Sequence, residues 1–270
     1  MSPAMDPRAV QVTLTTPPRP WRHVEVHESI GSTNARALQL AQPWTVVVAD
    51  HQTQGRGRLR RDWHTPAGLA LTMSAALPLP EQLGWLPLIA GLATSDAVEA
   101  IAGVRAVLKW PNDLLVPTDG ERKLCGILCE AQPPSSRDPG LAVVGIGLNV
   151  RQSREQLPTD AATSLALCGA SVSRQSLAVA ILDELTARYA ALLADEAGAA
   201  SVRAAYRGRC ATIGSTVRIV RPGGPDVLGL AVAVDDSGQL VVDGAQGRAA
   251  WAAGDVTHVR PGSEASTSLA

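Results

Sequence analysis

The segment from Gln52 to Trp63, QTQGRGRLRRDW, places glycines and arginines together directly after an apolar stretch. Arginine carries a permanent, planar charge that can bind phosphate through two parallel hydrogen bonds. Gly55 and Gly57 would allow a positive φ and a close approach of the backbone to a ligand. The pattern predicts a loop that closes on an anion. Basic Gly/Arg loops also bind RNA or lie in solvent, so this segment alone leaves those interpretations open.

A second candidate segment, KWPND at 109 to 113, combines a cation, an indole, proline, an amide and a carboxylate at the end of an apolar strand. A simple Asx-type turn explains Pro111, Asn112 and Asp113 but not the adjacent lysine and tryptophan. The functional interpretation is that Asn112 bonds a nucleotide and that Asp113 holds magnesium beside phosphate oxygens.

Lys123 opens the apolar segment KLCGIL. A lysine at the start of a strand is ordinarily a solvated charge. Gly126 weakens the interior of this strand, which indicates the close approach of a ligand or of another backbone. GIGLN at 145 to 149 lacks the third glycine of a dinucleotide fingerprint, and the pattern GxxxxGK[ST] is absent. Nucleotide phosphates would therefore be held by the arginines of the 56 to 61 loop.

The elements that would position these residues alternate between hairpins and helices. Apolar runs predict strands at 24–26, 44–50, 68–77 and 141–150, a β-hairpin made by 107–113 and 123–131, and helices at 35–42, 83–101, 173–195 and 199–207. This order predicts an α+β fold, in which a mixed, largely antiparallel sheet carries helices on one side. From Ala211 onward, short strands separated by PGGPD, DSG and AQG predict a small barrel. The expected domains are a disordered tail at 1–20, a catalytic domain at 21–209, a barrel at 210–260 and a second tail at 261–270.

Composition narrows the classes of function. The 270 residues are 46% apolar, which is enough for a substantial core, and the net charge of −1 argues against a dedicated nucleic-acid binder. No stretch approaches the roughly 18 apolar residues of a membrane span, and the first residues lack a signal-peptide core, so we expect a cytoplasmic protein without a membrane partner. The four cysteines have no histidine pair at zinc-site spacing, and Cys125 and Cys129 are expected to be small buried apolar side chains.

Taken in order, GSTN (31–34), QTQGRGR (52–58), KWPND, KLCGIL (123–128) and GIGLN resemble the motif series of biotin protein ligases. The resemblance covers about residues 22 to 260. It implies a catalytic domain similar to those of class II aminoacyl-tRNA synthetases, followed by an SH3-like barrel. It also implies that biotin and MgATP form biotinyl-5'-adenylate and pyrophosphate, and that biotin then passes to one lysine of a biotin carboxyl carrier protein.

The resemblance also assigns roles to single residues. The catalytic residues would be Lys123, Arg56 and Arg58. The residues around biotin would be Ser32, Thr33, Asn34, Gln52, Gly55, Arg56, Gly57, Arg58, Lys123 and Gly126. Those at the ATP and adenylate side would be Arg58, Arg61, Trp63, Asn112, Asp113, Gly147 and Asn149, with Asp113 at the magnesium.

Three alternatives stay open at this point. A lipoate protein ligase would use the same adenylate chemistry, a nucleic-acid regulator would use the basic loop, and a non-catalytic interaction protein would use the small barrel. Too few residues precede GSTN for a helix-turn-helix domain, so we expect no DNA binding. A free sheet edge would allow carrier docking or a weak or ligand-dependent homodimer.

Overall fold

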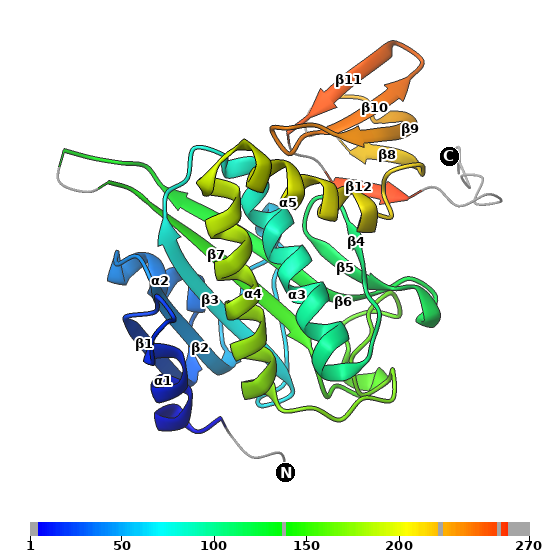
Figure 1. The fold of residues 1–270 in the computed structure, drawn as a ribbon. Coiled ribbons are helices and arrows are strands. Elements are labelled where there is room, and N and C mark those ends of the chain that lie inside the picture. The colour runs from blue at the N-terminus through cyan, green and yellow to red at the C-terminus, as the bar shows by residue number, and fades with distance from the viewer. Residues whose placement is uncertain (1–4, 137–138, 221–223, 253–254, 259–270) are drawn as a thin grey trace.

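The computed structural model describes residues 5–136, 139–220, 224–252 and 255–258, which form a seven-stranded sheet and a separate five-stranded sheet (Figure 1). The strands of the large sheet are β1 (His23–Ile30), β2 (Thr45–Gln52), β3 (Ala70–Pro78), β4 (Val107–Lys109), β5 (Asp113–Val116), β6 (Arg122–Gln132) and β7 (Leu141–Asn149). Their order across the sheet is β1-β2-β3-β7-β6-β5-β4. Only β1 and β2 run parallel, and the other neighbours are antiparallel. The predicted α+β class with a mixed sheet is confirmed.

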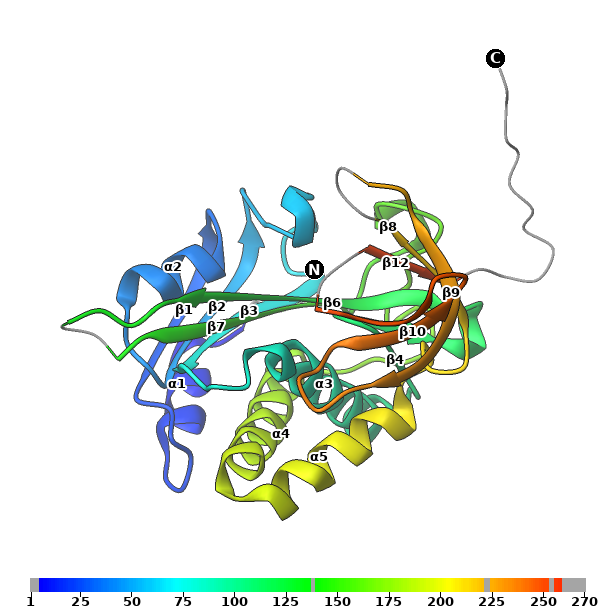
Figure 2. The same ribbon diagram turned by 90° about the horizontal axis from the view of Figure 1, so that it is seen from above.

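Helices cover both faces of the large sheet. They are α1 (Pro7–Thr15), α2 (Thr33–Leu40), α3 (Leu86–Ala102), α4 (Arg174–Ala194) and α5 (Glu196–Arg209). Figure 2 shows α1, α3, α4 and α5 on one face and α2 on the other, so the expectation of helices on one side fails for α2 alone. The central strands β2, β3 and β7 are almost wholly buried because both of their faces are covered, and their sequences are accordingly continuous apolar runs.

The N-terminal segment is not a disordered tail where the structure describes it. Asp6 caps α1 by accepting hydrogen bonds from the backbone amides of Arg8 and Ala9, at 3.0 and 3.2 Å. Val10 and Leu14, four residues apart, are fully buried, and α1 packs on β1 and α4. The expectation for residues 1–20 is therefore wrong from Pro7 to Thr15. The high proline and threonine content favoured a disordered segment, whereas Val10 and Leu14 form an apolar pair at helical spacing. The second expected tail, 261–270, lies outside the described residues.

The helix α3 is the apolar centre of the molecule. The segment Leu83–Ala102 is long and apolar enough to cross a membrane by length and composition, but 67% of it is buried inside the protein. It packs on β6 and β7 of the sheet and lies beside α4 (Figure 1). Its length and apolar character are accounted for by this core position.

The KWPND segment is itself a turn between β4 and β5, so the continuous strand expected over 107–113 is wrong, whereas the expected hairpin with the 123–131 segment is present. Lys109 pairs with Asp113 across the turn, and β5 then pairs with β6 in a second hairpin. A β-bulge interrupts the second pairing, because Leu114 faces Cys125 whereas Leu115 faces Lys123. The extra residue re-aims the side chain of Lys123, whose Nζ lies 3.1 Å from where a Cβ of Gly126 would stand. The four-residue strand β5 was too short to be recognised from its sequence.

The C-terminal sheet consists of β8 (Thr216–Val220), β9 (Val227–Val234), β10 (Leu240–Gly244), β11 (Gly247–Trp251) and β12 (Asp255–His258). The strands are antiparallel in the order β11-β10-β9-β8-β12, consistent with the predicted SH3-like domain. Two indole N–H groups attach it to the large domain: Trp85 donates to the carbonyl of Asp236 at 2.8 Å and Trp110 donates to that of Gly238 at 3.0 Å.

Glu25 on β1 should make the free energy of unfolding depend on pH in the acidic range. Arg36 of α2 donates two hydrogen bonds of 2.8 Å to Glu25, and these bonds, with smaller contributions from His27 and His23, lower the pKa of Glu25 from its ordinary value of 4.5 to about 2. A lowered folded pKa contributes stability above the unfolded pKa and loses it as the pH falls through the folded pKa. We therefore expect the free energy of unfolding to decline between pH 4.5 and pH 2, and Glu25→Gln to flatten this part of the curve. Urea unfolding across this range measures it, with exposed Glu28→Gln as control. A Glu25→Gln variant that kept the wild-type slope would contradict the expectation.

Candidate active site

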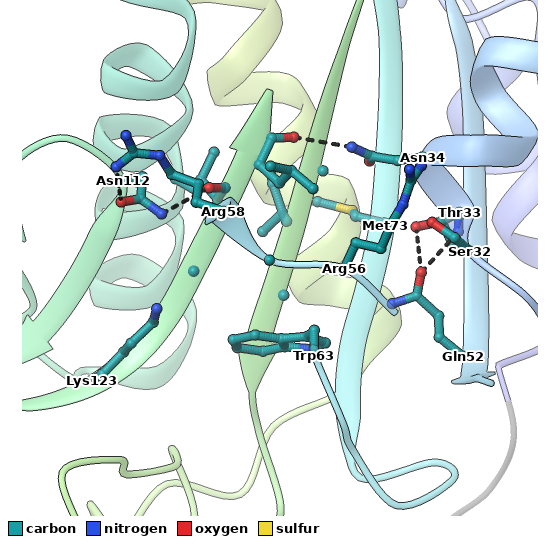
Figure 3. A pocket seen from close by; sticks show the side chains of 17 residues that line it. Ser32, Thr33, Asn34, Gln52, Arg56, Arg58, Trp63, Met73, Asn112 and Lys123 are labelled. Carbon is teal, nitrogen blue, oxygen red and sulfur yellow. Dashed lines mark hydrogen bonds between the residues drawn. The ribbon is translucent and has the colours of Figure 1, made fainter. Parts of the chain in front are cut away.

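The predicted motifs meet at one cavity on the face of the sheet that carries α2 (Figure 3). This inner cavity has a free volume of about 60 Å³ and lies against α2, β3, β6, β7 and the basic loop. Its lining includes the predicted residues Ser32, Thr33, Asn34, Gln52, Arg56, Gly57, Arg58, Trp63, Asn112, Lys123, Gly126 and Gly147. Residues from five separate sequence motifs therefore surround a common space.

A larger outer cavity of about 600 Å³ adjoins the inner one. The two share Gly57, Arg58, Trp63, Asn112 and Lys123, which mark their junction. The other predicted residues of the nucleotide side, Arg61, Asp113 and Asn149, line the outer cavity. Gly55 alone among the predicted residues lines neither; it borders a third pocket, which residues of α2 also line.

The end of the inner cavity at α2 is polar, and amides and hydroxyls make up most of it. Gln52 accepts hydrogen bonds from the backbone amide and the hydroxyl of Thr33, at 2.8 and 3.1 Å. The hydroxyl of Ser74 lies 2.7 Å from Thr33 Oγ1 and 2.6 Å from Asn34 Oδ1. These side chains are buried, and Ser32 caps α2, which presents Thr33 and Asn34 at its first turn. The arrangement suits a ligand that carries hydrogen-bond donors and acceptors on a neutral group.

The floor of the cavity is flat because glycines form it. Gly126 and Gly147 are cross-strand partners on β6 and β7, and the indole of Trp63 rests on them. A Cβ at Gly147 would stand 2.5 Å from the indole, and one at Gly145 would stand 2.3 Å from Asn34 Oδ1. The indole Nε1 is buried and has no hydrogen-bond partner within the described part of the chain. The glycines thus leave room for a ring, and Trp63 occupies part of that room.

Three cations line the inner cavity together (Figure 3). Lys123 Nζ lies 2.7 Å from Asp113 Oδ1 and 5.8 Å from the centre of the Trp63 ring. Arg58 donates to Asn112 Oδ1 at 3.1 Å, and Arg56 lies 3.4 Å from Glu130 Oε2. Lys123 and Lys109 are the only two lysines of the 270-residue chain. The site therefore concentrates positive charge where the two cavities meet.

The backbone of the basic loop differs from expectation. Gly55 and Gly57 are not among the positive-φ glycines, and Gly57 is extended at φ −109° and ψ −177°. The residue with a positive φ is Leu59, at 55°. Gly55 is still required, because a Cβ there would stand 2.3 Å from the carbonyl oxygen of Trp63. A glycine is therefore required at position 55 by the close packing of the loop on itself and not by a positive φ.

Asn149 and Asp113 have protein partners already. The side-chain amide of Asn149 donates a hydrogen bond to the carbonyl of Thr163 and accepts one from the side chain of Gln152, both at 2.9 Å. Asn149 therefore also supports the wall of the outer cavity. No group of three or more His, Cys, Asp or Glu side chains in the described residues could hold a metal ion. Asp113 is a single carboxylate, which fits magnesium only as an ion that arrives with nucleotide phosphates.

Several residues in or behind the lining were not predicted. Ser74 and Glu130 bond Asn34 directly, and Met73, Leu128, Gly145 and Ile146 complete the inner wall. A signal existed for Glu130, which alternates with Gly126 and Leu128 along one face of β6. No local signal existed for Thr257 and His258 of β12, which reach the outer cavity from the C-terminal sheet.

Comparison with known proteins agrees with this geometry. Residues 26–149 match the biotin/lipoate A/B protein ligase family, and residues 212–259 match the biotin protein ligase C-terminal domain. The chain is 38% identical to the biotin--[acetyl-CoA-carboxylase] ligase of Mycobacterium tuberculosis, over 96% of this chain and 98% of that protein. It is 33% identical to the corresponding ligase of Paracoccus denitrificans, over 83% and 96%. A biotin protein ligase from Aquifex aeolicus, solved in complex with biotin and ATP, superposes with a TM-score of 0.72 and 26% identity, over 89% of this chain and 100% of that one.

The fold and the two joined cavities thus define a ligase of the biotin and lipoate class. Within that class, the chain belongs to the biotin protein ligase family.

Proposed function

We propose that this chain is an ATP-dependent biotin protein ligase, which makes biotinyl-5'-AMP and then biotinylates one lysine of a biotin carboxyl carrier protein. One observation carries the proposal: a pocket with amides and hydroxyls at one end adjoins, across a glycine floor, a larger cavity, and cations lie where the two meet. Biotin would place its ureido ring at the polar end and its carboxylate beside Lys123 and Arg58. ATP would occupy the outer cavity, with its α-phosphate at the junction.

The polar end favours biotin over lipoate. The ureido group offers one acceptor and two donors, whereas the dithiolane ring of lipoate offers no comparable group to Thr33, Asn34, Gln52 and Ser74. These side chains bond one another in the structure, and a ureido group could exchange hydrogen bonds with them whereas a dithiolane ring could not. A competition assay with biotin, lipoate and labelled ATP decides between the two, and preferential formation of lipoyl-AMP would reject our choice.

The first half-reaction brings two anions together. A carboxylate oxygen of biotin attacks the α-phosphorus of ATP; a P–O bond forms as the bond to the bridging oxygen breaks, and pyrophosphate leaves. Lys123, Arg56 and Arg58 would neutralise the charge that concentrates in this transition state. Asp113 would hold the Lys123 ammonium in place through their 2.7 Å ion pair.

The second half-reaction consumes the mixed anhydride. The amine of the carrier lysine attacks the acyl carbon, a C–N bond forms, the C–O bond to phosphate breaks, and AMP leaves while the amine loses a proton. Until the carrier arrives, the basic loop would cover the anhydride and exclude water. Arg56, Gly57 and Arg58 are well placed for this because they lie over the inner cavity.

We assign Asp113 to the magnesium ion that accompanies ATP, because its carboxylate lines the outer cavity. Magnesium would supply neutralisation of phosphate charge there. The four cysteines are free, in keeping with a reducing compartment such as the cytoplasm.

Mass spectrometry gives the direct test of the proposed function. Purified protein is incubated with biotin, MgATP and a biotin carboxyl carrier domain, and the carrier should gain one biotinyl group. Reactions without ATP, or with the carrier lysine changed to arginine, should give no product. An unmodified carrier in the complete reaction would overturn the proposal.

The glycine floor predicts a selective loss of biotin binding. A methyl group at position 145 would collide with Asn34 Oδ1, so we expect Gly145→Ala to raise the KM for biotin by about tenfold or more, with a smaller effect on the KM for ATP. Biotin-dependent ATP–pyrophosphate exchange measures both constants. Gly208→Ala is the matched control, because a Cβ there meets nothing within 4 Å. An unchanged KM for biotin in Gly145→Ala would exclude this placement of the ureido ring.

A further inference from the structure

Residues 158–163 form a wall of the outer cavity without belonging to a helix or strand. The same segment holds the backbone of Lys123 from both sides. The amide of Lys123 donates to the carbonyl of Ala161 at 2.7 Å, and the amide of Thr163 donates to the carbonyl of Lys123 at 2.8 Å. The position of this wall and the position of Lys123 are therefore mechanically linked.

Two arginines fix the segment through its carbonyl groups. Arg122 Nε donates to the carbonyl of Asp160 at 2.8 Å, and Arg154 donates to that of Ala162 at 2.7 Å. Both guanidinium groups also contact Asp119, Arg122 at 2.8 Å and Arg154 at 3.4 Å from a carboxylate oxygen. A hydrogen bond from the Thr163 side chain is the largest cause of the lowered pKa of Asp119, followed by the opposing effect of burial and by the charge of Arg122.

We propose that Asp119, Arg122 and Arg154 are positioning residues that set the nucleotide-side wall and the location of Lys123. The inference rests on the proposed function, since it takes the outer cavity as the ATP site. None of the three residues lines the inner or the outer cavity, so they act through segment 158–163 and not by touching substrate. Of the inner cavity they affect only Lys123, at its junction with the outer cavity, whereas the end at α2 is built without them. The predicted defect therefore falls mainly on the nucleotide.

The magnitudes separate this role from a contribution to stability. Partly exposed ion pairs of this kind contribute little to the free energy of unfolding. Displacement of a reacting or positioning group by about 1 Å can reduce the rate about 100-fold. Loss of the Asp119 carboxylate should therefore impair catalysis much more than folding.

The test compares Asp119→Ala and Asp119→Glu with the wild type in biotin-dependent ATP–pyrophosphate exchange. We expect Asp119→Ala to raise the KM for ATP about tenfold or more and to lower kcat, while the Kd for biotin alone changes less than twofold. Asp119→Glu should recover part of the loss because it retains a carboxylate for both arginines. Asp243→Ala is the matched control, since Asp243 pairs with Arg248 at 3.4 Å in the C-terminal sheet.

The outcomes are distinguishable. Absence of biotin-dependent exchange in the wild type refutes the proposed function itself. An active wild type together with a KM for ATP within twofold of normal in Asp119→Ala refutes the positioning role. Equal rises in the KM for ATP and the Kd for biotin also refute it, because they indicate general loosening. Should Asp119→Ala not fold, Arg154→Lys replaces it under the same criteria, since lysine keeps the charge but loses the two-pronged contact with Ala162 and Asp119.

Discussion

Lys123→Ala is expected to reduce biotin-dependent pyrophosphate release some hundreds-fold while the protein stays folded. Loss of one group that stabilises transition-state charge typically costs about 3–4 kcal/mol. The ammonium lies at the junction of the two cavities, where the biotin carboxylate and the α-phosphate would meet, and its side chain is 35% exposed, so no cavity in the core results. ATP–pyrophosphate exchange measures the rate, and thermal unfolding verifies the fold.

Two further variants sharpen this experiment. Lys123→Arg keeps the charge and should retain more exchange activity than Lys123→Ala. Arg248→Ala removes a cation from β11, which lines neither cavity, and should behave as wild type. Near-normal pyrophosphate release by Lys123→Ala would show that the ammonium does not take part in adenylate formation.

Arg56→Gly and Arg58→Gly are expected to release biotinyl-5'-AMP and so to label lysines indiscriminately. A hydrogen bond to a charged group is worth about 1.5–3 kcal/mol, which corresponds to a roughly tenfold to hundredfold faster escape of the anhydride. The larger effect should come from Arg58, which borders both cavities and bonds Asn112, whereas Arg56 lies toward Glu130.

Escape is measured by spin-column retention of labelled adenylate and by biotinylation of serum albumin in the same tube. A separate bystander protein is needed because the ligase itself carries only two lysines, Lys109 and Lys123, both of which border the outer cavity. Retention equal to wild type in both variants would show that these arginines do not hold the intermediate.

The sequence was most informative where a motif adjoins a long apolar strand. The segments before and after the basic loop are buried strands β2 and β3, and GIGLN ends β7, so the apolar pattern alone was enough to place the chemistry-bearing residues at the sheet. The family resemblance added the expectation that residues of all five motifs surround biotin and ATP, and these residues do line adjoining cavities.

What could not be predicted depends on tertiary pairing. The bulge before Gly126 exists only in the register of β6 against β5, and it decides which way Lys123 points. Ser74 is a polar residue within an apolar strand, and the sequence does not show its role. That role is defined only when α2 packs on the strand and Ser74 bonds Asn34. The helix α1 was missed because two buried side chains in a polar segment are a weak signal until β1 and α4 are there to cover them.

The attachment of the small C-terminal sheet limits how far this protein can be shortened. Ending the chain near residue 210 would remove the carbonyl groups that accept hydrogen bonds from the indoles of Trp85 and Trp110. It would also remove Thr212, whose hydroxyl accepts a hydrogen bond from the backbone amide of Trp110 at 2.9 Å. Trp110 is fully buried and is followed within three residues by Asn112 and Asp113. A minimal biotinylation reagent derived from this chain would therefore have to keep the sheet.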